Sequence, residues 1–256
     1  MSGYHGKFVW YELMTTDTKA AETFYRSVIG WGAQDTGMPD MSYTLMTVGA
    51  IPVAGLMAVP QRALDAGARP SWTGYVAVDD VDARAAQAKQ DGGAIHHPPD
   101  DIPGVGRFAV IADPQGASLC LFKSNVEPGQ SPTPGTPGTA GWRELYATDR
   151  EAGFAFYAKL FGWTKAEHVD MGPMGIYQLF AAGGETIGGM MTKPPAVPRS
   201  SWTYYFNVDA VDAAAARVQA AGGQVLNGPH QVPGGSWIVQ CCDPQGAMFS
   251  LVAPRR

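Results

Sequence analysis

Residues 10–31, WYELMTTDTKAAETFYRSVIGW, are matched by residues 142–163, WRELYATDREAGFAFYAKLFGW. The two stretches agree at ten of 22 positions when one is shifted by 132 residues. Two more pieces repeat further along the chain: residues 71–82 match 201–212 at eight of 12 positions, and the pentapeptide DPQGA at 113–117 recurs at 243–247. Self-similarity at a fixed long period indicates a duplicated structural unit.

A segment of different composition separates the two copies. Residues 124–141, SNVEPGQSPTPGTPGTAG, contain four prolines and no apolar periodicity, which is typical of an extended linker. We therefore predict a first domain over residues 1–124, a linker over 125–140 and a second domain over 141–256. Each domain has about the length of an ordinary small domain.

Each copy also contains a fainter repetition, in which a strand-like run is followed by a helix. Apolar residues at Ala21, Phe24, Tyr25 and Val28 predict a helix that begins after Asp17 and ends at Gly30. Short β-rich runs follow each helix, so each quarter of the chain is predicted as a β-α-β-β-β module. The four modules span about residues 7–60, 70–124, 141–193 and 200–256.

Composition excludes several classes of protein. With 18 Lys+Arg against 23 Asp+Glu, the chain has a net charge of −5, which argues against a nucleic-acid partner. No apolar run reaches the roughly 18–20 residues of a membrane span, and the first residues lack the pattern of a signal peptide. Three cysteines do not imply a disulfide framework, so we expect a cytoplasmic protein.

The ordered motifs resemble the vicinal oxygen chelate superfamily, which includes glyoxalases, bleomycin-resistance proteins and extradiol dioxygenases. The motifs are the strand–Asp–helix opening with Phe24-Tyr25 and Gly30-Trp31, the VDDVD at 78–82, and the DPQG turns. The resemblance implies an α+β fold in which four βαβββ modules form two eight-stranded, cup-like open sheets. Adjacent modules could pair, or the first with the fourth and the second with the third.

Enzymes of this superfamily usually hold one divalent metal on a His or Gln of the first strand and a Glu of the last strand of the modules. By the resemblance, the first-strand positions are here occupied by Trp10, Thr73, Trp142 and Thr203, and the last-strand positions by Cys120 and Ser250. Indole has no acceptor lone pair and a hydroxyl is a poor metal ligand. We therefore expect no metal ligands and no cofactor, and we expect the histidines at 96, 97, 168 and 230 in loops or at strand ends.

Strand alternation predicts which side chains face into the cups, because residues i and i+2 lie on one face. The predicted ligand-binding residues are Trp10, Met14, Thr73, Tyr75, Cys120, Trp142, Tyr146, Thr203, Tyr205, Asn207 and Ser250. Aromatic rings with a few hydroxyls and thiols are typical of a small-molecule pocket.

Glu12 and Glu144 are the candidate catalytic residues, since each follows an inward-facing Trp by two positions. A carboxylate in an apolar cup is expected to have a raised pKa and could act as a general base or acid. Two alternatives stay open: each Glu could be paired for structural reasons, or a register shifted by one residue would place both on the outer face.

Three functions are consistent with these features. The first is a protein, monomeric or homodimeric, that binds a small metabolite in its cups without the usual metal. The second, suggested by the resemblance, is a glyoxalase-like lyase or isomerase, or an oxygenase-type enzyme, with a dicarbonyl or its thiol adduct as substrate. The third is a scaffold protein whose cups bind nothing.

Overall fold

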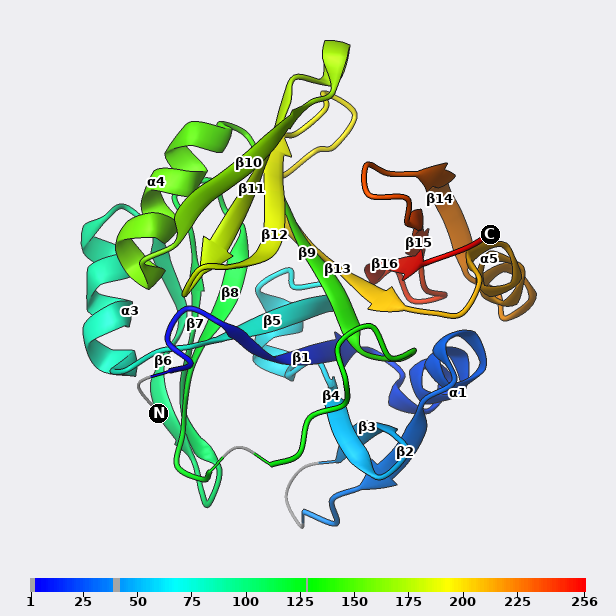
Figure 1. The fold of residues 1–256 in the computed structure, drawn as a ribbon. Coiled ribbons are helices and arrows are strands. Elements are labelled where there is room, and N and C mark those ends of the chain that lie inside the picture. Colours follow the sequence, from blue (N-terminus) through cyan, green and yellow to red (C-terminus); the bar gives the residue numbers. More distant parts are fainter. Residues whose placement is uncertain (1–2, 39–41, 128) are drawn as a thin grey trace. The chain divides into compact units, whose positions relative to one another are not determined.

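The computed structural model of this chain contains two eight-stranded mixed sheets. Figure 1 labels their strands and the helices that accompany them. The structure describes residues 3–38, 42–127 and 129–256. Four helices of ten or twelve residues accompany the sheets in these ranges. The predicted α+β fold of four βαβββ modules is confirmed.

The first sheet is built from the first half of the chain and the second sheet from the second half. The first has the strand order β2-β3-β4-β1-β5-β8-β7-β6, and the second has the order β10-β11-β12-β9-β13-β16-β15-β14. The strands of the first sheet are β1 (Phe8–Thr15), β2 (Gly32–Asp35), β3 (Tyr43–Val48), β4 (Ile51–Ala58), β5 (Ser71–Ala77), β6 (Ala94–Ile102), β7 (Gly106–Ala112) and β8 (Ser118–Ser124). Those of the second are β9 (Ala140–Ala147), β10 (Thr164–Asp170), β11 (Ile176–Ala182), β12 (Glu185–Thr192), β13 (Ser201–Asn207), β14 (Gln224–Gln231), β15 (Trp237–Cys242) and β16 (Met248–Ala253). Each sheet thus combines two adjacent modules.

The module helices form where their capping residues predict them. The helix α1 (Thr18–Ile29) begins after Asp17, whose carboxylate accepts a hydrogen bond from the Ala20 amide, and it ends at Gly30 with φ 90°. An L-residue with a side chain rarely adopts this left-handed conformation, so glycine is the natural C-terminal cap. The other module helices are α3 (Val81–Gln90), α4 (Arg150–Phe161) and α5 (Val211–Ala220), and α4 repeats the Asp cap with Asp149 and the glycine cap with Gly162.

The chain divides into two compact units that do not coincide with the two sheets. The first unit consists of the N-terminal residues as far as Val9, with Thr73–Gly129 and Arg143–Trp202. The second consists of Trp10–Trp72, Gln130–Trp142 and Thr203–Arg256. The second and third modules therefore make up most of one unit, and the first and fourth modules most of the other.

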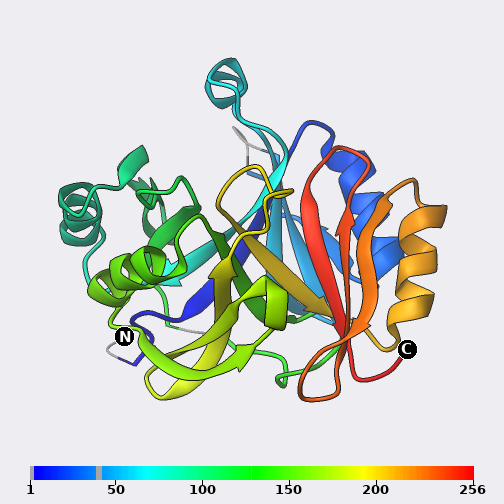
Figure 2. The ribbon, with the colours of Figure 1, turned by 90° about the horizontal axis from the view of Figure 1, so that it is seen from above.

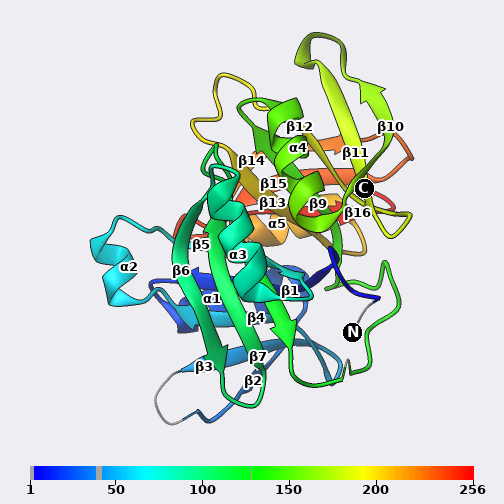
Figure 3. The same cartoon turned by 90° about the vertical axis from the view of Figure 1, so that its left-hand side faces the viewer.

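A buried tyrosine organises the interior of each unit. In the second unit, where α1 lies beside α5 (Figure 2), the Tyr25 hydroxyl accepts a hydrogen bond from Trp72 Nε1 at 2.9 Å and donates to Asp243 at 3.1 Å. In the first unit, where α3 contacts α4 (Figure 3), Tyr157 repeats this arrangement with Trp202 and Asp113. Burial raises the pKa of Tyr25 well above its ordinary value, which keeps the hydroxyl protonated as the donor to Asp243.

Each DPQG turn also fixes the beginning of a helix in the other module of the same compact unit. The Gln245 amide accepts a hydrogen bond from the Asp17 amide and donates to the Asp17 carbonyl, both at 2.8 Å. Gln115 makes the same pair of bonds with Asp149, at 2.7 and 2.8 Å. The motif that identified the repeat therefore joins modules within each unit.

The positions of two strands, and the presence of two short helices, were not predicted. The strands β6 and β14 lie at sheet edges and contain the prolines Pro98, Pro99 and Pro229, which lack the amide donor of an inner strand. The short elements are α2 (Gln61–Asp65) and the 3₁₀ turn at Gly172–Met174. The histidines were expected in loops or at strand ends. This is wrong for residues 96 and 97, which lie within β6, and for 168, which lies within β10, whereas residue 230 lies one position before the end of β14.

Within the described ranges, no helix has the length and apolar character needed to cross a bilayer.

Candidate functional site

The two faces of β1 have different surroundings. Tyr11 packs against the rings of Tyr204 and Phe206, at 5.3 and 6.2 Å between centroids. Phe206 in turn contacts Trp31, which packs against Tyr25 of α1. Because side chains alternate along a strand, Trp10, Glu12 and Met14 lie on the opposite side, which we call the helix-free face. The register with β4 pairs Glu12 with Gly55.

A hydrogen-bonded chain connects three side chains on the helix-free face of the first module. The Trp10 indole donates to the Tyr43 hydroxyl at 3.0 Å, and this hydroxyl donates to Glu12 Oε2 at 2.9 Å. Only 7% of Glu12 is exposed. Because a hydrogen bond to the ionised form stabilises a buried carboxylate, Tyr43 helps to keep Glu12 in place as an acceptor.

Gly55 makes room for this chain. A Cβ atom at Gly55 would overlap the Tyr43 ring and would lie 3.1 Å from Trp10 Nε1. Any larger residue would therefore displace the tyrosine from Glu12. The glycine is required by a close approach of side chains, since its φ lies in the ordinary range.

The third module repeats this geometry. Glu144, 6% exposed, pairs with Gly189 on β12, and the Tyr177 ring lies where a Cβ of Gly189 would be. Tyr146 is paired with Met191, and its counterpart Met14 is paired with Met57. Each of these two modules therefore carries a buried carboxylate, a glycine paired with it on the neighbouring strand, and a tyrosine that lies against this glycine near the beginning of its own strand.

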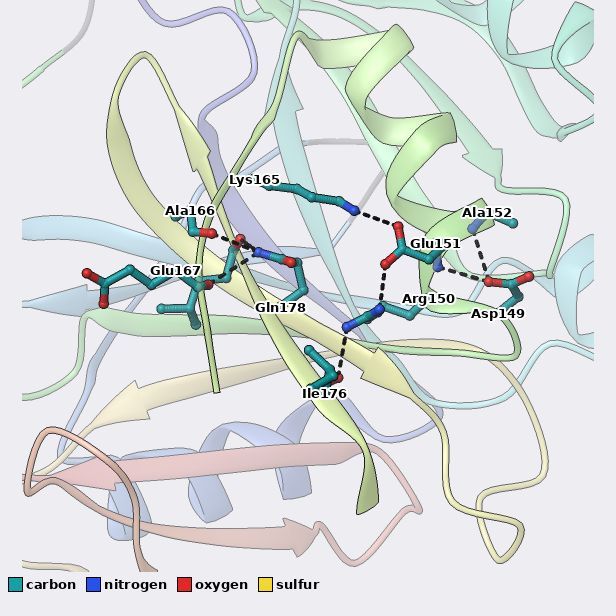
Figure 4. Close-up of polar contacts among 10 residues, drawn as sticks. Asp149, Arg150, Glu151, Ala152, Lys165, Ala166, Glu167, Ile176 and Gln178 are labelled. Atoms are coloured by element: carbon teal, nitrogen blue, oxygen red, sulfur yellow. Dashed lines mark hydrogen bonds and ion pairs between the residues drawn. The ribbon is translucent and has the colours of Figure 1, made fainter. Parts of the chain in front are cut away.

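Polar contacts connect β11 to β10 and to the first residue of α4, as Figure 4 shows. The Gln178 amide donates to the Ala166 carbonyl at 2.9 Å and the Glu167 carbonyl at 3.2 Å, across the register shift of β10. Arg150 donates to the Ile176 carbonyl at 3.4 Å. These bonds fix the backbone on both sides of Tyr177.

The second module has a largely apolar wall at its predicted site. Tyr75 pairs with Cys120, and its ring lies 5.9 Å from that of Phe122. The Cys120 thiol lies 3.4 Å from the Leu121 carbonyl, to which it donates. Thr73 is buried in the same strand.

The fourth module has a polar wall at the equivalent positions. Tyr205 pairs with Ser250, and the Gln240 amide donates to the Tyr205 hydroxyl at 3.2 Å. Thr203 is buried on β13. Asn207 donates to the Thr139 carbonyl and hydroxyl, at 3.1 and 2.9 Å, so it anchors the end of the linker.

The sequence analysis missed Tyr43, Tyr177 and Gln240. All three lie on the second strand after a module helix. The face that a side chain of this strand occupies depends on how the strand is paired with its neighbours. An aromatic residue at the same place in two repeats, Tyr43 and Tyr177, is a signal that a comparison of the copies could have used. Gln240 has no such signal, because its counterpart is Val110.

The residues present do not fit the metal-ligand set that the resemblance implies. Trp10 uses its only polar atom as a donor to Tyr43, and Cys120 donates to a backbone carbonyl. Among the described residues, no three His, Cys, Asp or Glu side chains come together as a potential metal site. We therefore derive no chemical step through a metal.

Fold and site together define an α+β protein of tandem βαβββ modules with carboxylate–tyrosine pairs on two of its strands. Residues 7–121 and 139–251 match the family model described as Glyoxalase/Bleomycin resistance protein/Dioxygenase superfamily. The chain belongs to this superfamily.

Two relatives and one solved structure show what this chain is similar to. "Putative glyoxylase CFP32" of Mycobacterium tuberculosis is 38% identical over 248 residues, which cover 96% of this chain and 94% of that protein. The "Anthracycline biosynthesis protein DnrV" of Streptomyces peucetius is 32% identical over 98% of this chain and 94% of its own length. The Mn(II)-bound glyoxalase from Novosphingobium aromaticivorans shares the fold, with a TM-score of 0.63, 16% identity and coverage of 98% of this chain and 82% of that one.

Proposed function

We propose that this chain binds a small metabolite on the helix-free faces of its sheets, without the metal site that is usual in the superfamily. The observation that carries this proposal is the chain of hydrogen bonds from Trp10 through Tyr43 to Glu12. It occupies the strand where the resemblance implies a metal ligand. A fixed carboxylate beside an indole ring suits an aromatic ligand with a hydrogen-bond donor.

The energetics of burial support a binding role for the carboxylate. Removing Glu12 from water is costly unless its oxygen atoms accept hydrogen bonds. A ligand N–H or O–H donor beside Glu12 would give the carboxylate an additional hydrogen bond. Hydrogen bonds to charged groups contribute about 1.5–3 kcal/mol. The repetition of the arrangement at Glu144 gives the chain two such faces. A cytoplasmic location stays a prediction of the sequence.

The test uses N-phenyl-1-naphthylamine, a neutral aromatic dye with one N–H donor, whose fluorescence rises in apolar sites. We expect Glu12→Gln and Glu144→Gln each to weaken its binding at one face by about tenfold or more, with little change in melting temperature. Exposed Glu127→Gln is the control and should bind as the wild type does. Failure of the wild type to bind the dye would contradict the proposal. Normal binding by variants that melt markedly lower would assign the glutamates a structural role.

The name of the mycobacterial relative favours a second candidate, a glyoxalase-like lyase or isomerase. In that role Glu12 or Glu144 would take a proton from the carbon beside a carbonyl and return it to the adjacent carbon. Incubation with methylglyoxal and a thiol, with and without added Mn²⁺, tests this activity. Loss of thioester formation in the Glu→Gln variants would support the enzyme, and its absence from the wild type in both conditions would argue against it.

A further inference from the structure

Ser250 is buried without a hydrogen-bond partner. None of its surface is exposed, and its hydroxyl is the buried side-chain group that lacks a partner among the described residues. Buried hydroxyls are nearly always paired, because an unpaired one loses its bonds to water without replacement. The hydroxyl therefore keeps its hydrogen-bonding capacity for a further polar group.

The strand register shows which face carries this hydroxyl. Phe249, the preceding residue, packs against Phe24 and Tyr25 of α1 at 5.8 and 5.2 Å. Ser250 accordingly points to the helix-free face of the fourth module. Tyr205 on one side and Gln240 on the other are its direct cross-strand neighbours, so the three side chains share this face.

A series of hydrogen bonds orients the amide of Gln240. Asn227 donates to Gln240 Oε1 at 3.2 Å, so Nε2 is directed to the Tyr205 hydroxyl. His230 Nε2 lies 2.8 Å from Asn227 Oδ1. The series runs from the exposed residues of the edge strand β14 to the buried Tyr205. These hydrogen bonds therefore fix the orientation of the Asn227 and Gln240 side-chain amides.

The second module lacks this arrangement, although it is the repeat of the fourth. The residues at the positions equivalent to Ser250, Gln240 and Asn227 are Cys120, Val110 and His97. His97 stacks on Phe108 with 4.9 Å between ring centroids, and Val110 has no side-chain polar group. The two copies keep the same strand register at these positions, so the walls differ in their side chains and not in the pairing of their strands.

We propose that the polar wall formed by Ser250, Gln240 and Tyr205 recognises an uncharged carbonyl-bearing ligand, and that the apolar wall of the second module does not. The proposal rests on the proposed function and adds a ligand class to one of its faces. The Ser250 hydroxyl would donate a hydrogen bond to the carbonyl oxygen of the ligand. All three side chains are neutral, and a charged ligand group buried against them would have no counter-charge from this wall.

The test compares two neutral dyes on the full chain: prodan, a naphthyl ketone, and N-phenyl-1-naphthylamine, which has no carbonyl. The variants Ser250→Cys and Gln240→Val replace each residue by its counterpart in the second module, so the fold has already accommodated these side chains at the same register. We expect each variant to weaken prodan binding at one site by about tenfold, with unchanged binding of the amine dye. Exposed Glu127→Gln is the control and should leave prodan binding as in the wild type.

The outcomes separate this inference from the proposed function. If the wild type binds neither dye, the proposed function fails and this inference with it. If it binds the amine dye but not prodan, or if Ser250→Cys and Gln240→Val bind prodan as the wild type does, the inference alone is wrong. Equal loss of both dyes in these variants, or an equal effect of Glu127→Gln, would also overturn it, because the loss would then not come from carbonyl recognition by this wall.

Discussion

At the scale of single residues, aspartates of the DPQG turns combine burial with hydrogen bonding. Asp113 is 3% exposed, accepts hydrogen bonds from the amides of Gln115 and Ala117 at 2.8 and 2.9 Å, and accepts one from the Tyr157 hydroxyl at 3.0 Å. Burial, the largest influence, raises the pKa of Asp113 above its ordinary value of 3.8, although these bonds act in the opposite direction.

This shift predicts a pH dependence of stability. A folded pKa above the unfolded one means that the folded protein binds the proton more tightly, so the contribution of Asp113 to stability is greatest below pH 3.8. It falls as the pH rises through the raised folded pKa. We expect the free energy of unfolding of the wild type, minus that of Asp113→Asn, to decrease over this range in urea titrations. The exposed Asp209→Asn should show no such trend, and a difference that grows with pH would contradict the prediction.

The candidate site shows what residue patterns can and cannot predict. Alternation placed Trp10 and Glu12 on one face of one strand, because that inference needs only neighbouring residues. Tyr43 was missed although it bonds to both, since its position depends on the register of β3 against β4 and of β4 against β1. The hydrogen bonds of Asn207 to Thr139 were not predicted either, because the two residues lie 68 positions apart in the chain.

At the scale of elements, capping residues and apolar periodicity predicted the helices well. The positions of the edge strands β6 and β14 were not predicted, because prolines such as theirs are typical of loops. The DPQG turns were recognised as motifs, but their role was not, because Gln245 and Asp17 are separated by 228 residues.

The glutamine contacts predict that DPQG turns stabilise the helices they touch. Gln245→Ala removes two bonds to the Asp17 backbone and the contacts of its oxygen with the Thr15 and Thr16 hydroxyls, so we expect a loss of about 1–3 kcal/mol in the free energy of unfolding. Gln115→Ala should cost less, since it removes only the two bonds to Asp149.

Urea unfolding of both variants provides the measurement, with Gln61→Ala on the exposed surface of α2 as a control expected within about 0.5 kcal/mol of the wild type. Equal stability of all three variants would show that the turns do not support the helices.

At the scale of the whole molecule, the repeat predicted the number of modules but left open which modules share a sheet, and the structure places two adjacent modules in each sheet. The repeat could not predict that each compact unit takes modules from both halves, because this depends on which module surfaces are complementary. In the second unit, Trp31 donates to the Gly138 carbonyl at 2.8 Å and Arg217 to the Val28 carbonyl at 2.8 Å. The first bond attaches the linker to the first module, and the second connects segments on opposite sides of the linker.

This arrangement predicts that the two halves of the chain stay together when the linker is cut. A protease site inserted between Gly129 and Gln130 lies where the chain passes from one unit to the other. After cleavage, residues 1–129 and 130–256 should elute together in size-exclusion chromatography and separate only in denaturant, because each unit buries side chains from both fragments, as with Tyr25 and Asp243. Separate elution of two folded fragments would instead mean that the domains 1–124 and 141–256 are independent. A cleaved Tyr25→Phe variant should dissociate at lower urea concentration than the cleaved wild type, since it lacks the hydroxyl that joins Trp72 to Asp243.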